Sequence, residues 1–361
     1  MASQRIASVD ILRGVTIAAM ILVNTPGTWS HVYAPLLHAD WHGLTPTDLV
    51  FPFFLFIVGI SIYFSYKNKP SNSSTYRKII IRSIKLIGLG LFLGAFLPYM
   101  PFVKEFDSIR FPGVLQRIGI VFLISAILYK NFNWKALLGI FIFILVGYWI
   151  WLGFIPLPDG SLPTFERAGN NWTMFVDSNL LGSHMWKVDY DPEGLVSTLP
   201  AIATCLSGVL IGRVLDKGNA LLKLILFGAI MTVLGYVWNN WFPLNKALWT
   251  SSFVLVTSGI GTLVLALIYY ITDVRRVTIG TIFKYVGMNA IVIYFASSFI
   301  TKCFYLLKVG ETTIHGWLYN TIFVHDFMAP KLSSMLYGLS VVLFYLLLGY
   351  VMYRKRIFIK V

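Results

Sequence analysis

The residues best suited to chemistry lie in one short polar stretch between two apolar segments. Asn24 ends the first apolar segment, three of the chain's six histidines follow as His31, His38 and His42, and Asp48 opens the next apolar segment. An imidazole can act as a base, a nucleophile or a metal ligand, and a neighbouring carboxylate can orient it. The stretch therefore predicts an acid–base or nucleophilic site.

Each of these residues also has a plainer interpretation. Thr45, Pro46 and Asp48 match a capping box, in which Asp48 closes the start of a helix. Asp48 could instead orient a histidine or pair with a buried arginine. His38 and His42 have the i,i+4 spacing of a zinc-binding pair, but no HExxH pattern and no suitably placed cysteine accompanies them. We therefore expect no metal, and a loop histidine can equally be a surface residue.

The composition places this stretch in a membrane protein. The chain has 361 residues, 57% hydrophobic and 12% charged, with a mean hydropathy of +0.74. Apolar runs long enough to cross a bilayer recur from end to end. The sequence predicts an all-α polytopic membrane protein with one domain over 1–361. About ten helices are expected, over roughly 7–25, 46–66, 77–97, 111–129, 135–154, 194–214, 220–238, 248–271, 281–301 and 333–353.

The net charge of +14 follows from the predicted topology rather than from a nucleic-acid partner. One face holds 20 Lys and Arg against three acids, and the opposite face nine against twelve. Basic segments stay in the cytoplasm, so both termini are expected there. Outer loops 26–45 and 155–193 then form the acceptor side. Asp10 and Arg13 interrupt the N-terminal apolar run, which predicts a retained span rather than a cleaved signal peptide.

Polar side chains inside predicted helices are costly and are functional candidates. Asp10 and Arg13 have i,i+3 spacing and can form an ion pair at the membrane interface. Gln116 and Arg117 lie more than a turn inside a helix, where Arg117 needs an acidic partner or an anionic ligand. A structural salt bridge is the favoured interpretation. Asn289 is expected to form a hydrogen bond between helices.

Two polar clusters open predicted helices on the outer side. In YDPEG at 190–194, Asp191 is expected to be the N-cap of the sixth helix, with Glu193 in its first turn. Lys246 and Trp249 open the eighth helix. The aromatic residues of loop 155–193 favour an ordered surface for a sugar or for the membrane interface.

These stretches together resemble the transmembrane heparan-α-glucosaminide N-acetyltransferase family. The matching pieces run in family order: SVDILRG (8–14), ILVN (21–24), LHADWHGLTPTDLVFPFFLFIVG (37–59), RFPGVLQRIG (110–119), YDPEG (190–194), NKALWTSSFV (245–254), GMN (287–289) and YRKRIFIKV (353–361). The resemblance implies a compact multi-span enzyme and a homodimer. Because the large lumenal domain of the animal enzymes does not precede these pieces, a bacterial inner-membrane enzyme is expected.

The resemblance implies transfer of an acetyl group from cytosolic acetyl-CoA to a terminal glucosamine across the membrane. His38 matches the family's active-site histidine, whereas His42 stands where the animal sequence has asparagine. Asn24 matches an intramembrane asparagine and is expected to donate to the thioester carbonyl. Asp48 is expected to hold the imidazole tautomer.

The same resemblance distributes the remaining candidates between donor and acceptor. Coenzyme A phosphates would stay near Arg13 on the basic face, and the pantetheine arm would follow the first helix, which rises about 21 Å from Asp10 to Asn24. The residues expected to bind acetyl-CoA are Asp10, Arg13, Gln116, Arg117, Lys246 and Asn289. The residues expected to bind the amino sugar are Trp41, Asp191, Glu193 and Trp249.

Several functions remain open at this point. His38 could take a proton while the acceptor amine attacks directly, or could itself carry the acetyl group. The same residues would serve O-acetylation of an envelope glycan. A transporter of amino sugar or of acetyl-CoA would explain the buried polar groups without chemistry. A zinc-dependent hydrolase would use His31, His38 and His42.

Overall fold

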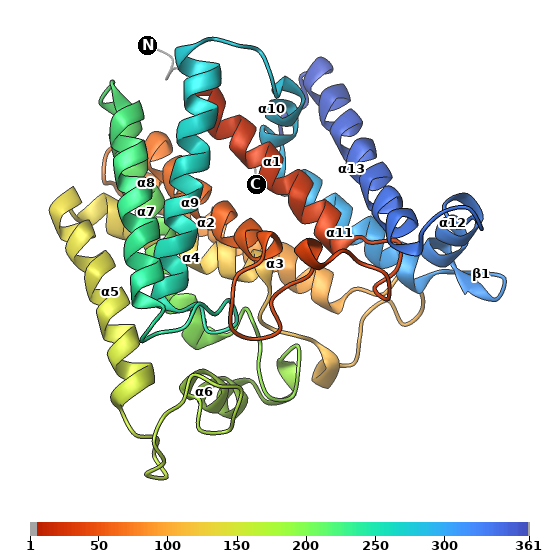
Figure 1. Cartoon of the computed structure of the whole chain (residues 1–361), viewed down its shortest axis with the longest axis horizontal. Helices are drawn as coiled ribbons and strands as arrows, with labels where there is room; N and C mark the ends of the chain where they lie inside the picture. The colour runs from red at the N-terminus through yellow and green to blue at the C-terminus, as the bar shows by residue number, and fades with distance from the viewer. Residues whose placement is uncertain (1–5, 360–361) are drawn as a thin grey trace.

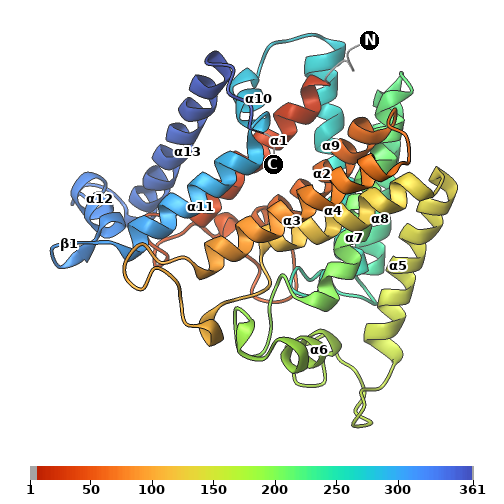
Figure 2. The same cartoon turned by 180° about the vertical axis from the view of Figure 1, so that it is seen from behind.

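The computed structural model describes residues 6–359, whose regular secondary structure is almost wholly helical (Figures 1 and 2). The all-α prediction is confirmed. The helices are α1 (Ala7–Asn24), α2 (Val50–Tyr66), α3 (Ser73–Ala95), α4 (Val114–Asn131), α5 (Trp134–Phe154), α6 (Trp172–Leu181), α7 (Leu195–Asp216), α8 (Ala220–Trp238), α9 (Ser251–Tyr269), α10 (Thr281–Gly287), α11 (Ala290–Leu306), α12 (Ile314–Ile322) and α13 (Pro330–Arg354). A hairpin of β1 (Lys308–Val309) and β2 (Thr312–Thr313) joins α11 to α12.

Over residues 6–359, eight helices are long and apolar enough to cross a membrane, and the number is nine if the bent pair α10 and α11 is counted as one span. The chain is a multi-pass membrane protein. The remaining predicted span, 77–97, corresponds to α3, whose first half carries several basic residues that are costly in hydrocarbon. Arg5 and Lys360, counted on the basic face, lie outside the described residues.

The ninth predicted helix, 281–301, is broken. The chain turns by 81° between α10 and α11. At the turn, the Asn289 side chain donates to the Ile357 carbonyl at 3.0 Å and accepts from the Ile359 amide at 3.1 Å. The predicted hydrogen bond from Asn289 to another helix is therefore wrong, because this side chain fastens the tail that follows α13.

Helix α2 packs backbone to backbone against α7. A Cβ atom on Gly59 would lie 1.9 Å from the Cys205 carbonyl oxygen, and one on Gly208 would lie 1.9 Å from that of Phe56. Only glycine permits such an approach. This contact fixes α2, which carries the polar stretch at its start, against the centre of the bundle.

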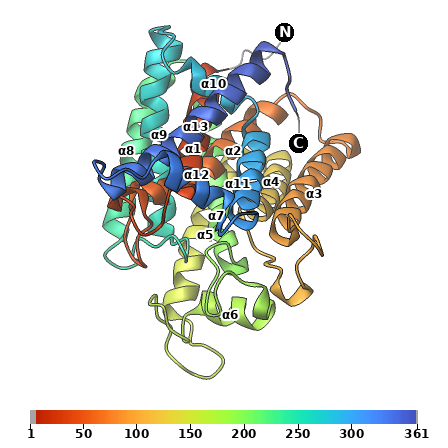
Figure 3. The same cartoon turned by 90° about the vertical axis from the view of Figure 1, so that its right-hand side faces the viewer.

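The segments expected on the outer side gather at one edge of the bundle. In Figures 1 and 2, the loop after α1 and the loop between α8 and α9 lie in the lower half, with helix α6 below them, and the N-terminal end of α1 lies at the top. Figure 3 shows α6 and the chain around it below the long helices. Residues far apart in sequence therefore meet near the start of α2.

Candidate active site

His38 and Asp48 are in direct contact just before α2, where residues Pro46–Leu49 form a short 3-10 helix. His38 Nδ1 lies 2.7 Å from Asp48 Oδ1. Asp48 Oδ2 accepts hydrogen bonds from the amides of Ala39 and Thr45 and from the Thr45 hydroxyl. The predicted capping box is confirmed. One carboxylate thus both caps the helix and orients the histidine.

The contact with Asp48 determines which imidazole nitrogen is free. A carboxylate only accepts hydrogen bonds, so Nδ1 of His38 carries the hydrogen and Nε2 of the neutral ring keeps a lone pair. The Asp48 side chain is 1% exposed, whereas that of His38 is 49% exposed. The site therefore presents an accessible base or nucleophile on a buried anchor.

Lys246 lies against the same ring, on the loop between α8 and α9. Its Nζ is 3.0 Å from His38 Nε2, 3.1 Å from Nδ1, and 3.9 Å from Asp48 Oδ1. Burial lowers the pKa of Lys246 below its usual value and Arg117 adds to this, whereas Glu193 and Asp48 oppose it. The structure thus places Lys246, expected among the acetyl-CoA ligands, at the histidine.

The two outer loops meet beside this pair. Trp41 Nε1 donates to the Phe165 carbonyl at 2.9 Å, and the Trp41 ring packs edge-on against Tyr190 with centroids 5.3 Å apart. His42 Nε2 lies 3.2 Å from Glu166 Oε1. Loop 155–193 is therefore ordered against loop 26–45, and His42 belongs to the contact between them.

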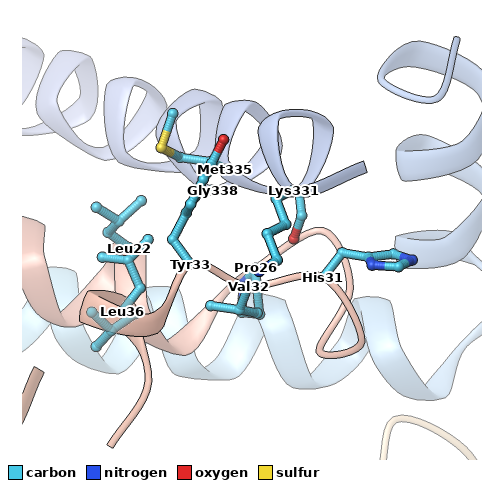
Figure 4. A pocket seen from close by; sticks show the side chains of 11 residues that line it. Leu22, Pro26, His31, Val32, Tyr33, Leu36, Lys331, Met335 and Gly338 are labelled. Atoms are coloured by element: carbon cyan, nitrogen blue, oxygen red, sulfur yellow. The ribbon is translucent and has the colours of Figure 1, made fainter. Parts of the chain in front are cut away.

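Asn24 and His31 lie apart from these contacts. Asn24 is the last residue of α1, and its exposed side chain makes no hydrogen bond to any residue within 6–359. His31 borders a cavity of about 10 Å³, room for about one water. Figure 4 shows its ring pointing away from Leu22 and Leu36. The oxyanion role of Asn24 stays a prediction.

The two carboxylates expected to bind the acceptor pair with Arg110, just before α4. Asp191 accepts from Arg110 through both oxygens, at 2.5 and 2.7 Å, and Glu193 Oε2 accepts at 2.5 Å. Burial opposes the charge of Arg110, but the hydrogen bonds and charges of these acids raise its pKa above the usual value. Arg110 therefore forms a salt bridge that was not predicted from the sequence.

Arg117 has no carboxylate partner within residues 6–359, so the salt bridge expected there is wrong. Its Nη2 donates to the Gly194 carbonyl at 3.0 Å and to Ser197 Oγ at 2.5 Å, and its guanidinium lies 5.1 Å from the centre of the Trp249 ring. The arginine is 1% exposed. Trp249, expected on the acceptor surface, is completely buried and donates to Thr204. Arg117 and Trp249 are therefore buried structural residues and do not lie on an acceptor surface.

Helix α7 is capped from another helix. Its first amides, Leu195 and Val196, donate to Asp177 Oδ1 at 3.0 and 3.3 Å. The predicted N-cap role of Asp191 is therefore wrong. Burial raises the pKa of Asp177 to about 6. The sequence does not predict this role of Asp177, because the carboxylate lies on α6 and not next to the start of the helix that it caps.

A basic cavity of about 590 Å³ lies between α1, α2, α3 and the α10–α11 break. Among the described residues that line it, none is acidic and five are basic, namely Arg13, Lys69, Lys78, Arg82 and Lys85. Its lining follows α2 from Phe54 to Tyr66, about 18 Å along the helix. The i,i+4,i+7 spacing on α3 is visible in the sequence, but membrane topology also explains those charges. The cavity suits an elongated ligand with phosphates.

The expected acetyl-CoA ligands do not converge on one place. Arg13 and Asn289 line the basic cavity. Arg13 also donates to Asp10 at 2.8 Å, which confirms the predicted ion pair. Gln116 lines a separate cavity of about 260 Å³ beside Arg110.

Comparison with known proteins agrees with the resemblance found in the sequence. Residues 5–236 match the family model described as heparan-alpha-glucosaminide N-acetyltransferase, catalytic. The chain is 29% identical to the heparan-alpha-glucosaminide N-acetyltransferases of Homo sapiens and of Mus musculus. These alignments cover 99% of this chain and 60% and 61% of the relatives, so the chain spans about three-fifths of their length. This chain belongs to the heparan-alpha-glucosaminide N-acetyltransferase catalytic family.

Proposed function

We propose that this protein is a transmembrane acetyltransferase that moves an acetyl group from cytosolic acetyl-CoA to an amino sugar on the periplasmic side. One observation carries the proposal: the same helix borders two polar sites. His38 and Asp48 lie at the start of α2, and the basic cavity follows the same helix from Phe54 to its end. Membership of the family supports acetyl transfer as the reaction.

The spacing along α2 suits coenzyme A. The phosphates would bind the basic side chains, and the pantetheine arm would run toward the histidine. The cavity lining reaches Phe54, only six residues and about 9 Å along the helix from Asp48. A thin arm extending from the cavity would bring its thioester toward Nε2 of His38.

Two routes use the same atoms. In direct transfer, Nε2 of His38 removes a proton from the acceptor amine while its nitrogen attacks the thioester carbonyl and coenzyme A leaves as thiolate. In double displacement, Nε2 attacks first, coenzyme A leaves, and the acetyl-imidazole passes its acetyl group to the amine. Asp48 orients the ring in both routes, and Asn24 would donate to the carbonyl oxygen.

The acceptor would bind where the outer loops meet. Trp41 offers a ring to a sugar face. The Asp191 and Glu193 carboxylates are held by Arg110 and would support that surface from within the protein. In the proposed orientation both termini are cytoplasmic, the membrane is a bacterial inner membrane and the assembly is a homodimer. Cysteine accessibility on each loop and mass measurement in detergent test these points.

The direct test uses purified protein in detergent with radiolabelled acetyl-CoA and glucosamine. The proposal expects N-acetylglucosamine, lost in His38→Ala and retained in His325→Ala, which changes an exposed histidine outside the site. A transporter would give no product without a sealed compartment. An O-acetyl product would be released by mild alkali, unlike the amide. Wild-type transfer by a folded His38→Ala variant would overturn the assignment.

A further inference from the structure

The function proposed above, on which this inference rests, gives Lys246 no role. Yet Lys246 Nζ lies 3.0 Å from Nε2 of His38, the atom that reacts in either route. That distance is within the range over which a proton passes between two heavy atoms. Lys246 therefore lies against the imidazole ring, close to its reacting atom and 3.9 Å from Asp48 Oδ1.

The chemistry of the three groups defines the direction of this contact. The Nδ1 hydrogen of His38 is committed to Asp48, so the ring has one lone pair, at Nε2. A lysine ammonium carries three donors and no acceptor. Lys246 can therefore only donate. Because Nζ lies 3.0 Å from Nε2 and 3.1 Å from Nδ1, it lies over the imidazole ring, close to the reacting atom but not in line with its lone pair.

The surroundings of Lys246 make its ammonium easier to deprotonate than one in water. The charges that face it are the anions Glu193 and Asp48 and the cation Arg117, with the His38 ring in contact. Burial is the largest influence, and it lowers the pKa of Lys246. A lysine so placed can exchange protons, which an arginine cannot do.

The loop holds Lys246 in place through its neighbour. Asn245 is completely buried, and its Oδ1 accepts from the Leu248 amide at 2.8 Å. The Asn245 amide donates to the Thr250 hydroxyl at 3.1 Å. The contact between Lys246 and the histidine is thus set by the buried backbone of the loop.

We propose that Lys246 is a further catalytic residue, the proton carrier that works at Nε2 of His38. When Nε2 attacks the thioester, the carbon–sulfur bond breaks and one Nζ–H proton passes to the leaving thiolate. The neutral Lys246 amine then takes a proton from the acceptor's ammonium. The free amine attacks the acetyl-imidazole, its remaining extra proton goes to solvent, and both side chains return to their starting state.

The direct route balances in the same way. His38 takes the proton from the attacking amine, and Lys246 gives one to the thiolate. The imidazolium then returns its proton to Lys246 across the 3.0 Å contact. The inference therefore does not depend on which route operates.

The first test compares Lys246→Met with Lys246→Arg. A proton carrier predicts that both variants lower kcat by about a hundredfold, with the KM for acetyl-CoA close to that of wild type. A residue acting only through its charge would be rescued by arginine, and a coenzyme A ligand would change KM. Lys308→Met, on the exposed hairpin β1, is the matched control and should resemble wild type.

The second test replaces the amine itself. Lys246→Cys alkylated with 2-bromoethylamine restores a side chain of nearly the same length whose thioether makes the amine less basic. Activity should return, with the alkaline limb of the pH profile moved to lower pH. Wild type treated identically controls for Cys205 and Cys303.

Two outcomes would overturn the inference. Lys246→Arg with wild-type kcat and pH profile would leave Lys246 only an electrostatic role, and Lys246→Met with unchanged kcat would leave it none. If wild type transfers acetyl and these results appear, the inference alone fails. If wild type transfers none, the proposed function fails and this inference fails with it.

Discussion

Asp48 contacts His38 through Oδ1 at 2.7 Å and accepts from the Thr45 amide through Oδ2 at 3.0 Å, so its two oxygens have separate tasks. The side chain that starts α2 is also the one that selects the imidazole tautomer. Because the carboxylate is buried and held by several donors, the ring it holds has a defined orientation.

Asp48→Asn should separate these two tasks. The new amide can accept from Thr45 but would donate to Nδ1 of His38, which moves the imidazole hydrogen to Nε2 and removes the reactive lone pair. We expect a loss in kcat of about a thousandfold with a nearly unchanged Tm. Asp48→Ala should also lose the cap, at a cost of about 1–3 kcal/mol. Wild-type kcat in Asp48→Asn would disprove the orienting role.

Phosphate binding in the basic cavity can be tested with two acetyl donors, acetyl-CoA and acetyl-pantetheine. Arg82→Gln and Lys85→Gln should raise the KM for acetyl-CoA about tenfold or more, because each removes a positive charge facing the phosphates. Acetyl-pantetheine, which has no phosphates, should show the same KM in the variants and in wild type. Arg77→Gln, on an exposed position of α3 outside the cavity lining, is the matched control. Equal effects on both donors would contradict phosphate binding.

Much of this architecture could be predicted from the sequence, because apolar runs and helix caps are local signals. The capping box at Thr45 and the ion pair between Asp10 and Arg13 follow from spacing alone. The break before Asn289 could not be predicted, since it depends on a tail that follows another helix. The hydrogen-bonding of that tail is a tertiary contact without a periodic pattern.

In the site, too, local contacts could be predicted from the sequence and contacts between distant residues could not. The contact of Asp48 with His38 was among the predicted alternatives because only nine residues separate them. Lys246 was expected elsewhere, since it lies more than 200 residues from the histidine. Arg117 looked like the partner of a carboxylate, but the bundle supplies Arg110 to the acids and a carbonyl and hydroxyl to Arg117. Which arginine pairs with the acids depends on where each side chain is buried, and this is known only from the fold.

The approach of α2 to α7 predicts a contrast between two glycines. Gly59→Ala would place a Cβ 1.9 Å from a carbonyl oxygen of α7 and force the helices apart, at a cost of several kcal/mol, on the order of 2–4. Gly139→Ala on α5 meets nothing within 4 Å and should be neutral or slightly stabilising. Thermal unfolding in detergent measures both. Equal Tm values would contradict the close packing.

Asp177 predicts a pH effect on stability. Its pKa of about 6 lies above the ordinary value, so the folded protein binds this proton more tightly than the unfolded chain does. The contribution of Asp177 to the free energy of unfolding is greatest in acid and is lost as pH rises from about 4 to 6. Asp177→Asn keeps an acceptor for the α7 amides and removes the charge, so it should stabilise the protein at pH 7 by about 2 kcal/mol. A lower Tm than wild type at pH 7 would contradict this account.

Transfer across a sealed membrane tests the central claim most directly. Oriented proteoliposomes would hold glucosamine inside, on the side of loop 26–45, with radiolabelled acetyl-CoA added outside. The account predicts labelled N-acetylglucosamine inside for wild type and for His325→Ala, and none for His38→Ala. No labelled product inside wild-type vesicles, or equal product from the His38→Ala variant, would contradict it.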